Sequence, residues 1–179
     1  MKKFIGAICS AVAGILTFIM LCFDWFVQKN YFLGELVGER SATGWELISN
    51  KVKMDKYVVE GAFDDFKGAY VLHRVFAIIM LVVAVLLIVS AIILFLKNLN
   101  VIKSKFNFNK VNNILLTVFA VVVLIALAGI GVMALGAAKE VADLDGYKIS
   151  IFPAVCAWIQ LAVSVVACGC GWAFARKNK

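Results

Sequence analysis

The stretch RVFAIIMLVVAVLLIVSAIILFLK, residues 74–97, decides the fold of this chain. Only its first and last residues are charged. A helix needs about 20 mostly apolar residues to cross the hydrocarbon core of a bilayer. In lipid the backbone has to satisfy its own hydrogen bonds, which favours a helix over an open sheet. The stretch therefore predicts a membrane-spanning helix.

Three further runs are comparably long and free of charge. One fills residues 4–23, one lies between Lys110 and Lys139, and one lies between Lys148 and Arg176. The mean hydropathy of +0.98 agrees with a chain that is mostly embedded in lipid. We expect an all-α membrane protein, a four-transmembrane-helix bundle that forms a single integral membrane domain over residues 1–179. The expected spans cover residues 4–23, 71–96, 112–138 and 149–175, with an outer loop over residues 24–70.

The basic residues gather on one side of the expected bundle. Nine of them, and no acidic residue, lie before the first run, between the second and third runs, and after the fourth. Residues 24–70 instead carry six basic and eight acidic side chains. The positive-inside rule then places both termini in the cytoplasm and the long loop outside. The net charge of +7 follows from this topology and from attraction to anionic lipid, so we expect no nucleic-acid partner.

All five cysteines fall within the expected spans or at their edges, and none lies in the middle of the long loop. An outer loop without a disulfide is unusual for an animal cell-surface protein and ordinary for a bacterial one. The many Lys, Asn and Ile residues also indicate an AT-rich genome. We expect a multi-pass protein of a bacterial plasma membrane.

The long loop alternates turn residues with short β-prone segments. Glycines punctuate it, and residues 51–54 and 57–59 have alternating or β-branched side chains. We expect a small antiparallel β-sheet of three to five short strands in this first outer loop, followed by a helical turn over residues 63–68. The third helix is expected to extend to residue 141, and Pro153 to lie in the first turn of the fourth.

Small residues spaced by four mark two of the spans. They are Gly6, Ser10 and Gly14 in the first span and Ala167, Gly171 and Ala175 in the fourth. Such stripes let two helix backbones approach closely. They predict tight packing of spans one, three and four, with span two more exposed to lipid. A homodimer through the first stripe is the alternative.

The sequence offers little chemistry for catalysis or metal binding. His73 is the single histidine, and we expect it to be an interfacial side chain, because zinc and haem sites need several converging ligands. Cys168 and Cys170 are spaced as C-x-C rather than as the redox motif C-x-x-C. The uncharged runs hold no acid or base for a substrate path. We therefore expect a protein that is not an enzyme, with no catalytic residue, cofactor or metal.

Three residues are placed to fix the long loop on the bundle. Trp25 follows the first run and Arg74 opens the second, so adjacent antiparallel spans would bring them together. A guanidinium stacked on an indole is worth about 0.5–2 kcal/mol. Trp45, within Gly44-Trp45-Glu46-Leu47, is the expected third member, because a large aromatic ring in a polar loop has to bury itself.

With these residues the chain resembles the claudin superfamily of four-span proteins, which includes the peripheral myelin proteins and channel gamma subunits. Trp25 is similar to the signature Trp after the first span, and Arg74 matches the basic residue that opens the second. Gly44-Trp45-x-Leu47 resembles a permuted Gly-Leu-Trp, although the loop lacks the family's cysteine pair. The resemblance implies a left-handed bundle with a β-sheet in the first outer loop. It does not extend to the sealing of tight junctions.

These features indicate a non-enzymatic, claudin-like interaction or scaffold protein that presents its outer sheet to a protein, lipid or envelope partner. Besides the lipid bilayer, we expect a protein partner or a homo-oligomer. The alternative is an accessory or immunity-type subunit that docks through its spans onto a larger transporter, channel or toxin. The small-residue stripes suit both hypotheses.

Overall fold

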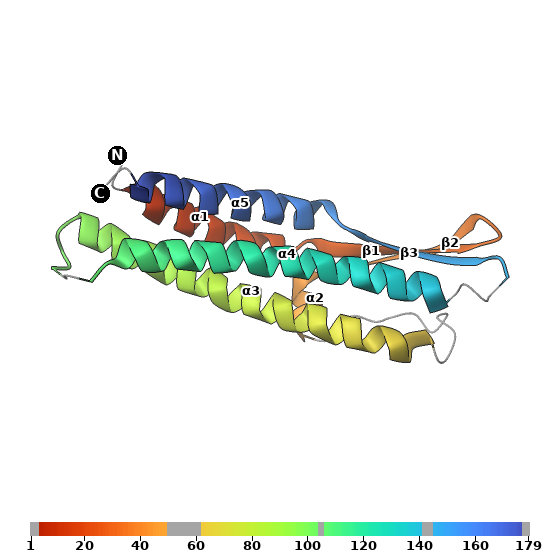
Figure 1. Ribbon diagram of the computed structural model, residues 1–179. Coiled ribbons are helices and arrows are strands. Elements are labelled where there is room, and N and C mark those ends of the chain that lie inside the picture. Colours follow the sequence, from red (N-terminus) through yellow and green to blue (C-terminus); the bar gives the residue numbers. More distant parts are fainter. Residues whose placement is uncertain (1–3, 50–61, 104–105, 141–144, 177–179) are drawn as a thin grey trace. The chain divides into compact units, whose positions relative to one another are not determined.

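A computed structural model describes residues 4–49, 62–103, 106–140 and 145–176. Helices and strands follow one another along these residues (Figure 1). In chain order they are α1 Ile5–Met20, β1 Asp24–Phe32, β2 Glu35–Thr43, α2 Gly44–Ser49, α3 Ala62–Asn98, α4 Phe108–Glu140, β3 Tyr147–Pro153 and α5 Val155–Arg176. The helical turn expected over residues 63–68 is thus the first part of α3.

The chain divides into two compact units. The first, which we call the helical unit, consists of Met1–Ile19, Ile79–Leu124 and Ile159–Lys179. The second, which we call the sheet unit, consists of Met20–Ile78 and Ile125–Trp158. The sheet unit contains β1, β2 and β3, whereas α3, α4 and α5 contribute residues to both units.

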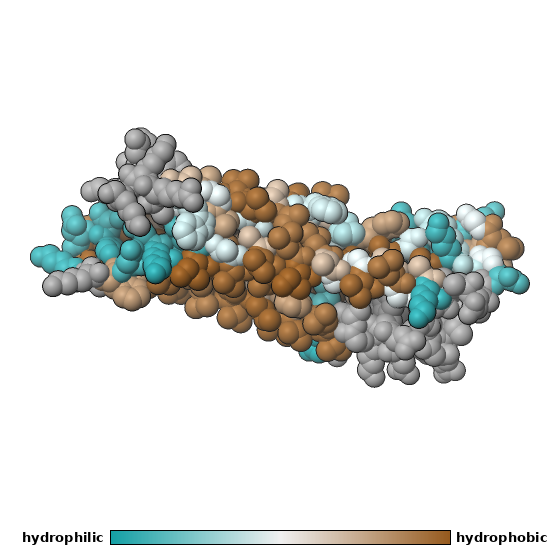
Figure 2. All heavy atoms as spheres, viewed as in Figure 1, coloured by the Kyte–Doolittle hydropathy of each residue, from teal (hydrophilic) through white to brown (hydrophobic). Residues whose placement is uncertain are grey.

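Three helices are long and apolar enough to cross a membrane. These segments are Val71–Asn98, Phe108–Lys139 and Val155–Ala173. Helix α1 is also apolar but has 16 residues, which is about 24 Å of helix. Figure 2 shows a hydrophobic surface over the helical unit, with hydrophilic side chains at the end that holds the α3–α4 connection. The expectation of a mostly helical, membrane-type fold is confirmed for these three helices.

Each helix of the helical unit buries one narrow seam. Its residues recur at alternating intervals of three and four, the 3.5-residue period of knobs-into-holes packing in left-handed bundles. The seams are Ala7, Ser10, Gly14 and Thr17 in α1; Met80, Ala84, Leu87, Ala91 and Leu94 in α3; Leu116, Phe119 and Val123 in α4; and Gln160, Ser164, Ala167 and Gly171 in α5. Small and polar residues dominate the seams of α1 and α5.

The expectation that span two is more exposed than its neighbours does not hold for α5. One third of the apolar window is buried in both α3 and α5, against one half in α4. Ala77, Ala84 and Ala91 recur every seven residues on the buried side of α3. They give this helix a small-residue face. This face is difficult to recognise in the sequence, because the alanines are scattered among many Val, Leu and Ile residues.

The sheet unit holds a three-stranded antiparallel sheet in the order β2-β1-β3 (Figure 1). Two strands come from the first long loop, but β3 comes from the short connection before α5. The fourth helix therefore begins at Val155 rather than at residue 149. Pro153 ends a strand, where its missing N–H is tolerated, and does not open a helix. The strands expected over residues 51–54 and 57–59 lie outside the described residues.

Candidate functional site

Helix α2 is fastened to Trp25 and to the residues that end α1. Trp25 is 1% exposed, and its Nε1 donates a hydrogen bond to the carbonyl of Met20 at 3.1 Å. Gly44 opens α2 beside this ring, where an added Cβ would lie 2.9 Å from Trp25 Nε1 and 3.0 Å from Leu21 Cα. A side chain at residue 44 would therefore force α2 and Trp25 apart. The backbone N–H of Trp45 donates to the carbonyl of Leu21 at 3.0 Å, which fixes the same contact.

Thr43 and Glu46 form a capping box at the start of α2, a feature that the sequence interpretation missed. The backbone N–H of Thr43 donates to Glu46 Oε2 at 2.8 Å, and the N–H of Glu46 donates to Thr43 Oγ1 at 3.2 Å. The reciprocal pair satisfies donors that an isolated helix start leaves free. The signal was available in the sequence, because Thr43-x-x-Glu46 is the usual spacing of this motif.

Leu47 and Arg74 hold the rest of α2. Leu47 is completely buried, and Arg74 Nε donates to the carbonyl of Ile48 at 3.3 Å. Trp45 is 38% exposed. Trp25 and Arg74 thus both contact residues of α2, whereas the Trp45 ring, which was expected to be buried, is not buried within the chain. That the three residues fix the loop stays a prediction. The stack of Arg74 on Trp25 stays a prediction, since the contact shown for the guanidinium is with a backbone carbonyl.

His73 is buried rather than interfacial, so that expectation is wrong. Its ring is 0% exposed and lies 6.4 Å from the ring of Trp25 and 6.2 Å from that of Phe26, centroid to centroid. Both ring nitrogens lack a hydrogen-bond partner among the described residues. Gly129 of α4 makes room, because a Cβ there would lie 3.4 Å from His73 Nδ1. His73 lies four residues before Ala77, so both residues are on the buried side of α3.

Large apolar side chains are exposed where the β1–β2 hairpin turns. They are Phe32, Leu33, Leu36, Val37 and, from β3, Tyr147, with exposed fractions of 38% to 75%. We call these five residues the apolar tip. The tip is held in place by a hydrogen bond from the Leu33 N–H to the carbonyl of Gly146 at 2.7 Å. The rings of Phe32 and Tyr147 also pack with their centroids 4.6 Å apart.

The hairpin turn at the apolar tip has an unusual residue. Leu33 and Gly34 both have positive φ, 51° and 87°, as a two-residue type I′ turn requires. Asn or Gly is the usual first residue of such a turn, since a branched side chain in the left-handed region costs roughly 1–2 kcal/mol. Leu33 is the most exposed member of the tip, at 75%. The chain thus keeps a strained, solvent-facing leucine at this position.

The small-residue stripes of the helical unit pack within the chain. A Cβ on Gly14 would lie 2.6 Å from Ile88 Cγ1 and 2.9 Å from the carbonyl oxygen of Ala84, so α1 and α3 are in backbone contact. A Cβ on Gly171 would lie 2.8 Å from a side-chain atom of Leu116 on α4. The stripe that would support a homodimer is thus occupied by the protein's own helices. The side chain of Ala175 lies outside the described part of the chain.

Buried polar side chains join neighbouring helices of the helical unit. Asn112 Oδ1 of α4 accepts hydrogen bonds from Ser10 Oγ of α1 at 2.7 Å and from Ser90 Oγ of α3 at 2.8 Å. Gln160 Nε2 of α5 donates to Thr17 Oγ1 of α1 at 2.8 Å. The amide nitrogen of Gln160 thus has a hydrogen-bond partner on a neighbouring helix. These bonds fix the register of four helices against one another.

The five cysteines, all within the described ranges, form no disulfide. Cys156 donates to the carbonyl of Asp24, and Cys168 lies 3.6 Å from Thr117 Oγ1. In the described ranges no three His, Cys, Asp or Glu side chains are grouped as metal ligands would be. Residue 60 lies outside those ranges, and the side chains of residues 64 and 65, at the start of α3, are not among those described. Cys156 and Cys168 therefore make the weak hydrogen bonds of partly or fully buried thiols.

No protein-family model matches the chain, and the search of curated proteins finds no match. The claudin-like relationship accordingly stays a prediction that rests on Trp25, Gly44, Trp45, Leu47 and Arg74.

Proposed function

We propose that the chain crosses a bacterial plasma membrane four times as a claudin-like bundle, with both termini cytoplasmic and the sheet unit outside. The packing of α1 supports a fourth span. Gly14 abuts Ala84 of α3 and Ser10 bonds to Asn112 of α4, so α1 lies alongside two helices that are long enough to cross a bilayer. The uncharged run over residues 4–23 extends beyond the 16 helical residues, which suits a short span.

Labelling of introduced cysteines tests this topology. On a background without native cysteines, Gly34→Cys should react with a membrane-impermeant maleimide in intact cells. Asn178→Cys should react only after the membrane is permeabilised. Labelling of residue 178 from outside, or protection of residue 34, would refute the proposed orientation.

The proposed role is that of a non-enzymatic interaction protein, whose apolar tip contacts a protein, lipid or envelope partner. Leu33 carries this proposal. At 75% exposure Leu33 buries only a small part of its side chain, beside Gly146, and its positive φ adds strain. Strained residues and contiguous exposed apolar patches both concentrate at functional surfaces. The hydrogen bond to Gly146 and the Phe32–Tyr147 contact hold the tip in one conformation. The tip therefore loses little conformational entropy when it binds a partner.

Photo-crosslinking in intact membranes tests the role. A benzophenone amino acid in place of Leu33 should give a discrete crosslinked partner, whereas the same group in place of the exposed Ser49 of α2 should not. A third probe replaces Val166, which is 62% exposed on α5. A crosslink to a larger membrane protein from residue 166 alone would favour the accessory-subunit hypothesis and count against the tip.

A further inference from the structure

The two faces of the β1–β3 pair differ in chemistry. The register places Tyr31 opposite Lys148, and alternation along β3 puts Ser150 and Phe152 on the same face as Lys148. The other face carries Ile151, which is 4% exposed, together with other buried residues. The first face is therefore free to receive something from outside the sheet.

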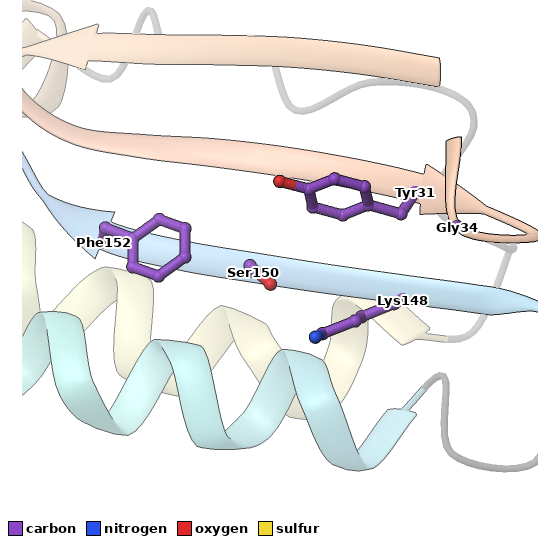
Figure 3. A pocket seen from close by; sticks show the side chains of 5 residues that line it. All are labelled: Tyr31, Gly34, Lys148, Ser150 and Phe152. Carbon is purple, nitrogen blue, oxygen red and sulfur yellow. The ribbon is translucent and has the colours of Figure 1, made fainter. Parts of the chain in front are cut away.

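A pocket of about 400 Å³ lies on this open face. It is lined by Tyr31, Gly34, Lys148, Ser150 and Phe152 (Figure 3). In Figure 3 the Tyr31 hydroxyl and the Lys148 ammonium both extend along the strands towards Ser150, with the Phe152 ring beyond them. A Cβ on Gly34 would meet nothing within 4 Å, which leaves that end of the pocket open. The volume is in the range of small-molecule sites, about 300–1,000 Å³.

The polar side chains that line the pocket can all donate hydrogen bonds, and none of its described lining residues is acidic. Among the described residues, no carboxylate lies within ion-pair distance of Lys148. Lys29 is on the same face, but it is paired with Glu39 at 3.4 Å. The uncompensated positive charge of this face is therefore that of Lys148.

We propose that this pocket binds an amphipathic anion, a molecule that joins a phosphate or carboxylate to an apolar group. The Lys148 ammonium and the hydroxyls of Tyr31 and Ser150 hold the anionic group with charge-assisted hydrogen bonds. The rings of Tyr31 and Phe152 cover the apolar part. The inference goes beyond the proposed interaction role, because the pocket needs no macromolecular partner. A lipid headgroup and a free amphiphile share this chemistry.

The test uses the full chain in phosphatidylcholine nanodiscs, titrated with phenyl phosphate by isothermal calorimetry. Wild type should bind saturably, and empty nanodiscs should not. Lys148→Gln should weaken binding about 10–100-fold and Tyr31→Phe about 10-fold, because each removes a hydrogen bond to a charged group. Lys29→Gln is the matched control, since it removes a paired lysine from the same face but not from the pocket lining. It should change affinity by less than about twofold.

A second set of nanodiscs identifies the source of the ligand. If the anion is a lipid headgroup, exchanging part of the phosphatidylcholine for phosphatidylglycerol should compete with phenyl phosphate and lower its apparent affinity. An unchanged affinity supports a free amphiphile. Absence of saturable binding, or equal losses in Lys148→Gln and Lys29→Gln, would overturn the proposal. Neither outcome depends on crosslinking from Leu33 or on membrane orientation, since nanodiscs expose both sides of the bilayer.

Discussion

Helix α1 buries small and polar side chains, whereas the start of β1 buries large apolar ones. In α1 the residues Ser10 and Thr17 are completely buried, while Ile8 and Ile15 are more than half exposed. In the sheet unit Trp25 and Phe26 are buried. Polar groups turn inward where the surroundings are lipid, because only other helices offer them hydrogen bonds. Apolar groups turn inward where the surroundings are water. The contrast is the one expected between a helix that faces lipid and a sheet that faces water.

The sheet unit departs from its own pattern at the apolar tip and at His73. One exposes large apolar side chains, and the other buries two ring nitrogens that have no hydrogen-bond partner in the described part of the chain. Such departures from the local pattern tend to mark functional positions. The variants below separate the stability of each unit from these exceptions.

The largest effect is expected from Trp25→Ala. Truncating a completely buried aromatic residue typically costs about 3–5 kcal/mol, because contacts are lost and a cavity is left behind. Here the change also removes the hydrogen bond to Met20 and the wall against which Gly44 and His73 pack. Hydrogen exchange should show the amides of β1 and β2 opening, while those of the helical unit stay protected.

Trp158→Ala is the matched control, because Trp158 is 55% exposed on α5. It should leave exchange in β1 and β2 close to that of wild type. Equal loss of protection in the two variants would mean that the buried core around Trp25 does not stabilise the sheet unit.

Helix contacts can be predicted from the sequence where small residues mark them, but not where both sides of a helix are apolar. The small residues Ser10, Gly14 and Gly171 stand out in apolar helices, and the structure places them at helix contacts. The heptad seam of α3 could not be predicted from hydrophobicity, because Ala84 and Leu87 face inward among exposed residues that are equally apolar. Both sides of α3 are apolar, so its inward side is marked only by the seven-residue spacing of Ala77, Ala84 and Ala91.

The sheet unit was harder to predict because its signals are distant in sequence. β3 lies almost wholly within an uncharged run that resembles the start of a span, and only pairing with β1 makes it a strand. The positions of Gly44 and Arg74 around α2 agree with the expectation that this segment fixes the loop. The pocket at Lys148 could not be foreseen, since it depends on the register that places Tyr31 opposite that lysine.

An intermediate effect is expected in the helical unit from Gly14→Ala. The new Cβ would approach the carbonyl oxygen of Ala84 to 2.9 Å, and backbone cannot rotate away as a side chain can. Forced separation of packed elements costs about 1–3 kcal/mol. The melting temperature in detergent should fall, with β1 exchange unchanged below the transition. Gly131→Ala is the control, because a Cβ on Gly131 of α4 meets nothing within 4 Å. An equal fall in the melting temperature of this variant would show that the α1–α3 contact is not close.

The smallest effect is expected from Arg74→Ala, which removes the hydrogen bond to the carbonyl of Ile48. One such bond contributes about 0.5–1.5 kcal/mol net, so α2 should loosen without unfolding the sheet. Limited proteolysis in membranes should cut faster near α2, while the exchange of β1 amides stays slow.

Arg74→Lys separates charge from geometry, since an ammonium retains the charge but not the planar fork that reaches the carbonyl from this position. If Arg74→Lys restores wild-type protection, the charge at the end of the span matters more than the bond. Wild-type protection in Arg74→Ala would show that the capping box and Gly44 hold α2 by themselves.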